Sequence, residues 1–223
     1  MKRIYVLLIV ASICLKTNVF AQDAPYIGAF GGYAWPSGVF TDLHDFSYKP
    51  VNNVGIFAEF DRLDHLFMNT GFIYSQEESG PVTFEPEVKD PKDFTSNIIF
   101  DYLQLYARLK WSYTVVKHVN FYYSGGLYGG YLLHGSYTEP VIVRGNYTDV
   151  DNTITATDNM HKGNGGLLGG VGFTFQISKL KIDIGADANY SFFYTLKDLP
   201  YRGTIYSAGV RGVLGISYPL VIE

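Results

Sequence analysis

The chain of 223 residues carries 17 basic and 21 acidic side chains, which argues against a nucleic-acid partner because phosphates call for a basic surface. Tyrosine (19 residues), phenylalanine (16) and glycine (24) are abundant, a combination that disfavours helices and favours strands with aromatic rings at membrane interfaces. No apolar run of 18 residues follows the N-terminal segment, which argues against a helical membrane protein.

Residues 1–21 have the order of a secretory signal peptide. Two basic residues precede an apolar segment at residues 4–15, and we expect cleavage after Ala21. Cys14 lies inside this segment, so the mature chain has no cysteine and no disulfide. Residues 22–223 are then expected to form one domain, with 14 basic and 21 acidic side chains and a formal charge of about −7.

Eight segments after the signal peptide alternate between apolar and polar residues. This is the pattern of a strand, because successive side chains point to opposite faces. In the fourth segment, Leu103, Leu105 and Leu109 fall on one face, whereas Gln104 and Lys110 fall on the other. The predicted strands are residues 25–35, 53–60, 66–75, 99–111, 120–133, 164–177, 181–192 and 204–218.

The connections between these strands are long and short in strict alternation. The expected long loops are residues 37–50, 76–97, 134–163 and 196–203, and the short turns are residues 61–65, 114–117 and 178–180. Transmembrane barrels show this layout, with short periplasmic turns, longer extracellular loops and an even number of strands. The pattern therefore predicts an all-β fold, an eight-stranded antiparallel up-and-down transmembrane β-barrel in the bacterial outer membrane, with both mature termini in the periplasm.

Alternation alone does not separate a membrane barrel from a soluble barrel of the lipocalin kind, because exchanging inside and outside leaves the same pattern. The composition of the polar face decides between them. A soluble barrel would carry many Lys and Glu residues on its outer face, whereas the polar positions here are mostly Gly, Ser, Asn, Thr and Tyr. We therefore expect the apolar face to contact lipid and the polar face to line the lumen.

A few charged residues fall on the face expected to line the lumen. An eight-stranded barrel is only wide enough for its own side chains, so these charges are expected to neutralise one another. We favour a plug of salt bridges without a wide pore, and a gated ion path is the functional alternative. The six residues are Glu59, Arg108, Lys110, Asp183, Asp187 and Arg211.

Three segments resemble strands of a known family. Residues 101–111 (DYLQLYARLKW) are similar to the strand YLEIPLLLKY of the outer-membrane β-barrel family of Bacteroidota that includes the PorT-like proteins. Residues 183–190 (DIGADANY) and 204–213 (TIYSAGVRGV) resemble the last two strands of that family. The resemblance implies an eight-stranded outer-membrane protein, and some members of the family serve protein secretion.

An enzymatic alternative rests on His134, Ser136 and Glu139. This group resembles the His-x-Ser arrangement of lipid A deacylases, which are small outer-membrane barrels. Catalysis would require the imidazole to reach the hydroxyl within about 3 Å and a carboxylate to orient the imidazole. Polar residues are common where a strand meets a loop, so we expect no enzymatic activity.

The sequence predicts no metal site and no cofactor. The other histidines lack ligand spacing, and a calcium site is only weakly indicated by Asp149, Asp151, Asn152 and Asp158 because the sharp-turn glycine is missing. The expected surroundings are outer-membrane lipid and lipopolysaccharide, with an envelope or secretion protein as partner and no nucleic acid.

Three classes of function remain open at this point. The first, which we favour, is a non-enzymatic structural or interaction protein that supports secretion or envelope integrity. The second is a lipid A-modifying enzyme, and the third is a narrow channel or small-ligand binder.

Overall fold

Ten strands form a single antiparallel sheet in the part of the chain that the structure describes, which comprises residues 24–40, 46–48, 50–83, 95–143, 146–154, 162–196 and 205–220. The structure is a computed structural model. Its strands are β1 (Tyr26–Phe40), β2 (Phe46–Tyr48), β3 (Val51–Leu63), β4 (Leu66–Thr83), β5 (Thr95–Val116), β6 (Val119–Val143), β7 (Asn146–Ile154), β8 (Gly163–Ile177), β9 (Leu180–Leu196) and β10 (Ile205–Pro219). The predicted signal peptide lies outside the described residues and stays a prediction.

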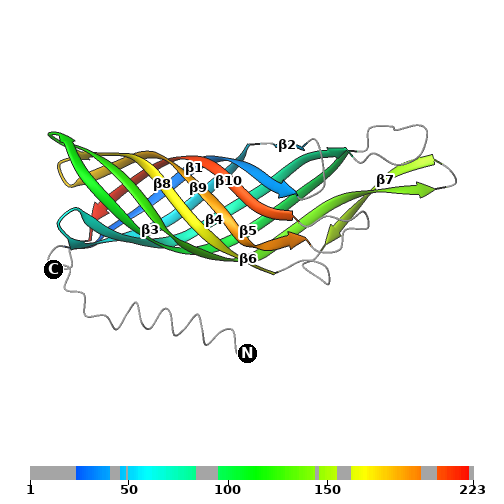
Figure 1. Cartoon of the computed structure of the whole chain (residues 1–223), viewed down its shortest axis with the longest axis horizontal. Helices are drawn as coiled ribbons and strands as arrows, with labels where there is room; N and C mark the ends of the chain where they lie inside the picture. The colour runs from blue at the N-terminus through cyan, green and yellow to red at the C-terminus, as the bar shows by residue number, and fades with distance from the viewer. Residues whose placement is uncertain are drawn as a thin grey trace, which may run out of the picture.

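Eight of these strands close into a barrel (Figure 1). Their order around the barrel is β4, β3, β1, β10, β9, β8, β6 and β5, and pairing between β4 and β5 completes the circle. Each strand pairs with its neighbours along the chain, and β1 pairs with β10 from Tyr26 and Pro219 onward. The predicted closed, eight-stranded antiparallel barrel is confirmed. Within the described residues, no helix is both long and apolar enough to cross a membrane.

Three two-residue turns lie at one end of the barrel, which we call the turn end. They are residues 64–65, 117–118 and 178–179, and each contains a non-glycine residue with positive φ: His65 (69°), His118 (69°) and Ser178 (57°). The first and last described segments meet at this end, where Leu220 donates a backbone hydrogen bond to Pro25 over 2.7 Å. All three predicted short connections are therefore turns, although each is shorter than expected.

The strands at the opposite end are longer than predicted, which corrects the loop boundaries. β4 and β5 continue into the predicted loop at residues 76–97, and residues 134–163 contribute a hairpin of β6 and β7 that projects from the barrel (Figure 1). The first predicted loop, residues 37–50, contains the short strand β2, which pairs with β4. Pro81 lies at a register shift of the β4–β5 ladder, where a missing backbone N–H is tolerated.

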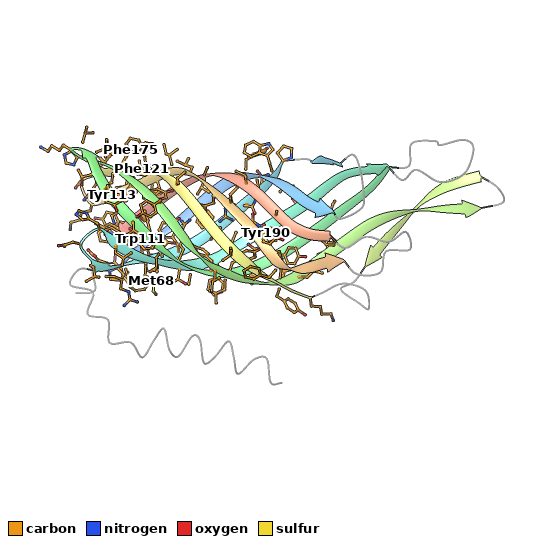
Figure 2. All side chains as sticks on the ribbon, in the orientation of Figure 1. Met68, Trp111, Tyr113, Phe121, Phe175 and Tyr190 are labelled. Atoms are coloured by element: carbon orange, nitrogen blue, oxygen red, sulfur yellow. The ribbon has the colours of Figure 1, made fainter. Side chains whose placement is uncertain are left out.

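The outer surface is apolar, as the alternation predicted (Figure 2). Ile184 and Val210 are half exposed, whereas Gln104 and Lys110 on the polar face are buried. The aromatic side chains Trp111, Tyr113, Phe121 and Phe175 gather toward the turn end, as expected of rings at a membrane interface (Figure 2). The large exposed apolar residues include Val54, Ile56, Phe72, Leu103, Leu127, Leu167, Val171, Phe173, Leu214 and Ile216.

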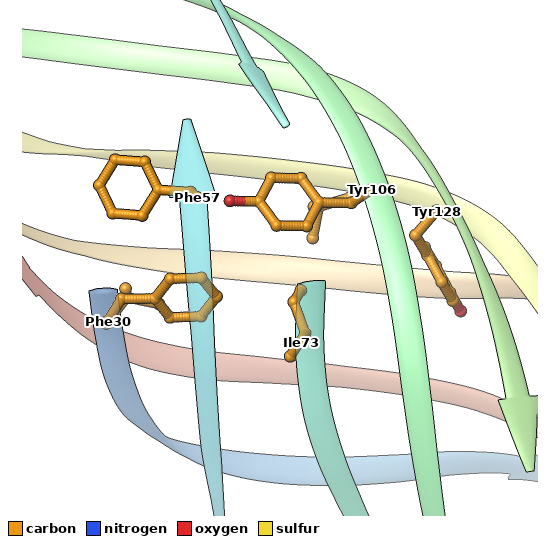
Figure 3. Close-up of a cluster of buried hydrophobic side chains, with 7 residues drawn as sticks. Phe30, Phe57, Ile73, Tyr106 and Tyr128 are labelled. Carbon is orange, nitrogen blue, oxygen red and sulfur yellow. The ribbon is translucent and has the colours of Figure 1, made fainter. Parts of the chain in front are cut away.

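A small apolar cluster fills part of the lumen (Figure 3). Its hydroxyl-bearing member Tyr106 is 2% exposed and donates a hydrogen bond to Asn69 Oδ1 over 2.8 Å, so the polar end of the ring is satisfied. Gly28 makes room for a ring, since a Cβ there would lie 2.6 Å from Cζ of Phe57. The cluster comprises Phe30, Phe57, Ile73, Tyr106, Tyr128, Leu168 and Val213.

Candidate functional site

Charged side chains from four strands meet inside the barrel. They form a network of five ion pairs, all of them largely shielded from solvent. We call this set the lumen network: Glu59 of β3, Arg108 and Lys110 of β5, Lys181, Asp183 and Asp187 of β9, and Arg211 of β10.

The part of the lumen network nearer the turn end contains two lysines and two carboxylates. Lys110 Nζ lies 3.0 Å from Glu59 Oε2 and 3.2 Å from Asp183 Oδ1. Lys181 Nζ lies 2.9 Å from Glu59 Oε1, so Glu59 accepts from both lysines. The hydroxyl of Thr174 donates a further hydrogen bond to Asp183. Formal charges in this group are balanced.

The second part of the network is a carboxylate held between two guanidinium groups. Arg108 Nη1 lies 3.0 Å from Asp187 Oδ1, and Arg211 Nη2 lies 3.0 Å from Asp187 Oδ2. Asp187 occupies the space beside Gly170, where an added Cβ would meet its Oδ1 atom. A glycine at position 170 is therefore required by the carboxylate that bridges the two arginines.

Aromatic rings lie beside all four cations of the network. Lys181 Nζ is 3.5 Å from the centre of the Tyr26 ring, and Lys110 Nζ is 4.5 Å from the centre of the Tyr122 ring. The guanidinium carbons of Arg108 and Arg211 lie 5.5 Å and 5.6 Å from the rings of Tyr106 and Phe30. These contacts offset part of the cost of desolvating the cations, by about 0.5–2 kcal/mol each.

The structure brings together all six residues that the sequence placed in the lumen, and it adds Lys181. The sequence carried a signal for this lysine, because Lys181 is two positions before Asp183 in β9 and therefore faces the same way. Lys181 was placed at the start of the predicted strand 181–192 but was not counted among the lumen charges. With Lys181 included, Glu59 and Asp187 each contact two cations, and Asp183 contacts Lys110.

A cavity of about 500 Å³ opens at the turn end. Glu59, Lys110 and Lys181 border it on the lumen side, while Asp61 and Lys179 stand among its other charged residues. Deeper in the barrel, the lumen network and the apolar cluster occupy the interior. The cavity is thus a vestibule that ends at the ion pairs.

The proposed catalytic group lies only in part within the described residues. His134 is exposed, and it follows a bulge in β6, because Asp101 pairs with His134 whereas Tyr102 pairs with Leu132. Positions 134 and 136 share a face of the strand as expected, but position 139 falls on the other face because the ladder continues from Gly135 without a shift. The side chains of Ser136 and Glu139 lie outside the described residues.

Within the described residues, His, Cys, Asp and Glu side chains form no group of three that would hold a metal ion. The side chains of Asp149, Asp151 and Asn152 lie outside the described part, although β7 carries their backbone, and Asp158 lies outside it altogether. The calcium site that these four residues weakly indicated is therefore untested.

Solved structures of outer-membrane proteins share this fold. Neisserial surface protein A (NspA) superposes with a TM-score of 0.53 at 13% sequence identity, over 88% of this chain and 97% of that chain. OprG from Pseudomonas aeruginosa superposes with a TM-score of 0.52 at 13% identity, over 90% of this chain and 98% of that chain. At this level of identity the likeness concerns the fold alone. No curated protein matches the sequence.

The family assignment comes from the sequence together with this fold. Residues 20–197 match the model of a family described as outer membrane protein beta-barrel domain, which is most of the chain. The match agrees with the closed barrel, its apolar exterior and its ionic lumen. The chain belongs to the outer membrane protein beta-barrel domain family and is a small β-barrel of the bacterial outer membrane.

Proposed function

We propose that this protein is a non-enzymatic barrel that acts through its surfaces, as a structural or interaction component of the outer membrane. The observation that carries the proposal is the lumen network. Its ion pairs connect β3, β5, β9 and β10 across the axis of the barrel. Opening a path for solutes would separate buried charges, which is costly because each would be left without a partner.

In this proposal the turn end faces the periplasm and the β6–β7 hairpin faces outward. The short turns and the meeting of the first and last described segments support this orientation, because both are features of the periplasmic side of outer-membrane barrels. The projecting strands then lie among the lipopolysaccharide head groups or beyond them. The vestibule at the turn end opens toward periplasmic partners.

The resemblance of three strands to the PorT-like family of Bacteroidota supports a partner in protein secretion or envelope maintenance. Such a partner is expected at the periplasmic turns or on the projecting hairpin. An enzymatic role as a lipid A deacylase is less well supported, because position 139 falls on the face of β6 opposite to positions 134 and 136. A narrow channel would require the lumen network to open.

Three experiments test the proposal. The purified protein in planar bilayers is expected to give no currents of porin size, and such currents would contradict a closed lumen.

Copurification from native membranes after mild extraction is expected to yield a specific envelope protein. A variant in which a short turn replaces the β6–β7 hairpin, compared with one altered only at residues 64–65, would tell which end of the barrel holds the partner. Lipid A mass spectrometry with Ser136→Ala completes the test, since a difference from the wild type would establish the enzyme instead.

A further inference from the structure

A second cavity lies inside the barrel, next to Arg211 of the lumen network. Its volume is about 20 Å³, enough for one small species, since a single water requires about 10–15 Å³. The cavity borders Arg211, and its other polar lining residues are Asn53, Ser75, Gln104, Tyr128 and Asn189. Apart from the guanidinium group of Arg211, these carry neutral amides and hydroxyls, all of which are able to donate hydrogen bonds.

Asn53 is the most completely buried of these lining residues. It is 1% exposed, and neither its Nδ2 nor its Oδ1 atom has a hydrogen-bond partner among the described residues. Buried amide groups are almost always paired, so an unpaired one on the wall of a polar cavity indicates that the cavity holds a hydrogen-bonding species. Asn53 and Arg211 project from β3 and β10, and both line this cavity.

The lumen network carries one more positive than negative charge. Its four cations face three carboxylates, and the two lysines are balanced by Glu59 and Asp183. The excess therefore belongs to Arg108 and Arg211, which share the single carboxylate of Asp187. Nε of Arg108 also has no hydrogen-bond acceptor among the described residues. An unbalanced charge in a buried site calls for a counter-ion.

We propose that the cavity binds one monovalent anion of about the size of chloride, held by the Arg211 guanidinium and the Asn53 amide. A water molecule would satisfy the amide but would leave the excess charge of the arginine pair in place. An anion satisfies both requirements, and the volume of the cavity excludes anything much larger. The bound anion would balance the charge of the lumen network, so the stability of the barrel would depend on the halide concentration.

The test compares urea unfolding of the purified barrel in micelles in sodium chloride and in sodium gluconate at equal ionic strength. Above the dissociation constant, each tenfold rise in chloride is expected to lower the unfolding equilibrium constant about tenfold, whereas gluconate, which is too large for the cavity, has no such effect. Identical curves in the two salts would mean that the cavity holds water only, and the proposal would be wrong.

Two variants with the same chemical change locate the site. Asn53→Asp places a carboxylate on the cavity wall, where it supplies the missing negative charge, so the dependence on chloride should be lost. Asn52→Asp makes the same change one residue earlier, at an exposed position of β3, and should keep the dependence. If Asn53→Asp still responds to chloride, the anion binds elsewhere and the proposal fails.

Crystals of the wild-type protein grown in sodium bromide give an answer that does not depend on any variant folding. An anomalous peak is expected between Asn53 and Arg211. If the cavity shows no such peak at high bromide concentration, the proposed site is ruled out.

Discussion

Lys110 on β5 reaches past β4 to Glu59 on β3, with 3.0 Å between Nζ and Oε2. The two strands are not neighbours in the sheet, so this ion pair adds a connection that backbone pairing does not provide. Glu59 also binds Lys181 of β9 from the far side of the lumen. A single carboxylate thereby joins three strands of the barrel.

Glu59→Gln is expected to destabilise the barrel by about 3–5 kcal/mol, because both lysines keep their charge and lose the shared carboxylate. Urea unfolding followed by tryptophan fluorescence in micelles measures the change. The matched control is Asp64→Asn in an exposed turn, which should stay within about 0.5 kcal/mol of the wild type. Equal effects of the two substitutions would show that the ion pairs with Glu59 add nothing to stability.

Gly170→Ala is expected to cost about 1–3 kcal/mol or more, since the new methyl group would displace the Asp187 carboxylate from the two arginines. The matched control is Gly125→Ala, because an added Cβ at Gly125 meets no atom within 4 Å. Both glycines lie in the middle of barrel strands, so backbone effects should be similar. The same unfolding measurement tests this prediction, and a loss of stability in Gly125→Ala as large as in Gly170→Ala would contradict it.

The barrel fold and the inward direction of its charged side chains were predictable, because the membrane imposes a simple rule on the sequence. In the apolar band each outward side chain contacts lipid, so alternation at residues such as Leu103 and Ile184 identifies the faces directly. Arg108 and Asp187 could be assigned to the lumen by this rule alone. The same rule failed for residues 76–83 and 134–143, where the strands extend beyond the predicted band and side chains no longer alternate in polarity.

The pairing of charges inside the lumen was not predictable from the pattern. Arg108 and Asp187 belong to β5 and β9, which are separated in the sheet by β6 and β8, and their contact depends on how the strands are staggered around the barrel. The stagger also decides that Asp187 serves two arginines. The bulge at Leu133 was missed as well, because an extra residue in a strand leaves no clear trace in a run of apolar residues.

Ile184→Arg tests the outward face of the barrel. Ile184 is 50% exposed on β9, five residues beyond the turn at residues 178–179, and an arginine in the apolar band is expected to cost up to about 2–4 kcal/mol. Val115→Arg is the matched control, because Val115 is similarly exposed (57%) but lies next to the turn at residues 117–118, where the cost should fall to about 0–1 kcal/mol. Unfolding in lipid vesicles measures both variants. Equal tolerance of the two arginines would mean that this face does not contact lipid.

Single cysteines test the orientation of the barrel. The only cysteine, Cys14, lies in the predicted signal peptide, so an introduced cysteine is expected to be the only thiol of the mature chain. Asp64→Cys places a thiol at the turn end and Asn152→Cys places one on β7 of the projecting hairpin. With the turn end in the periplasm, a maleimide that does not cross the outer membrane should label intact cells at position 152 and not at position 64. Lysis should then expose position 64 to the same reagent, which shows that its thiol is reactive. Labelling of position 64 alone in intact cells would mean that the turn end faces outward. Any partner that binds the vestibule would then lie at the cell surface.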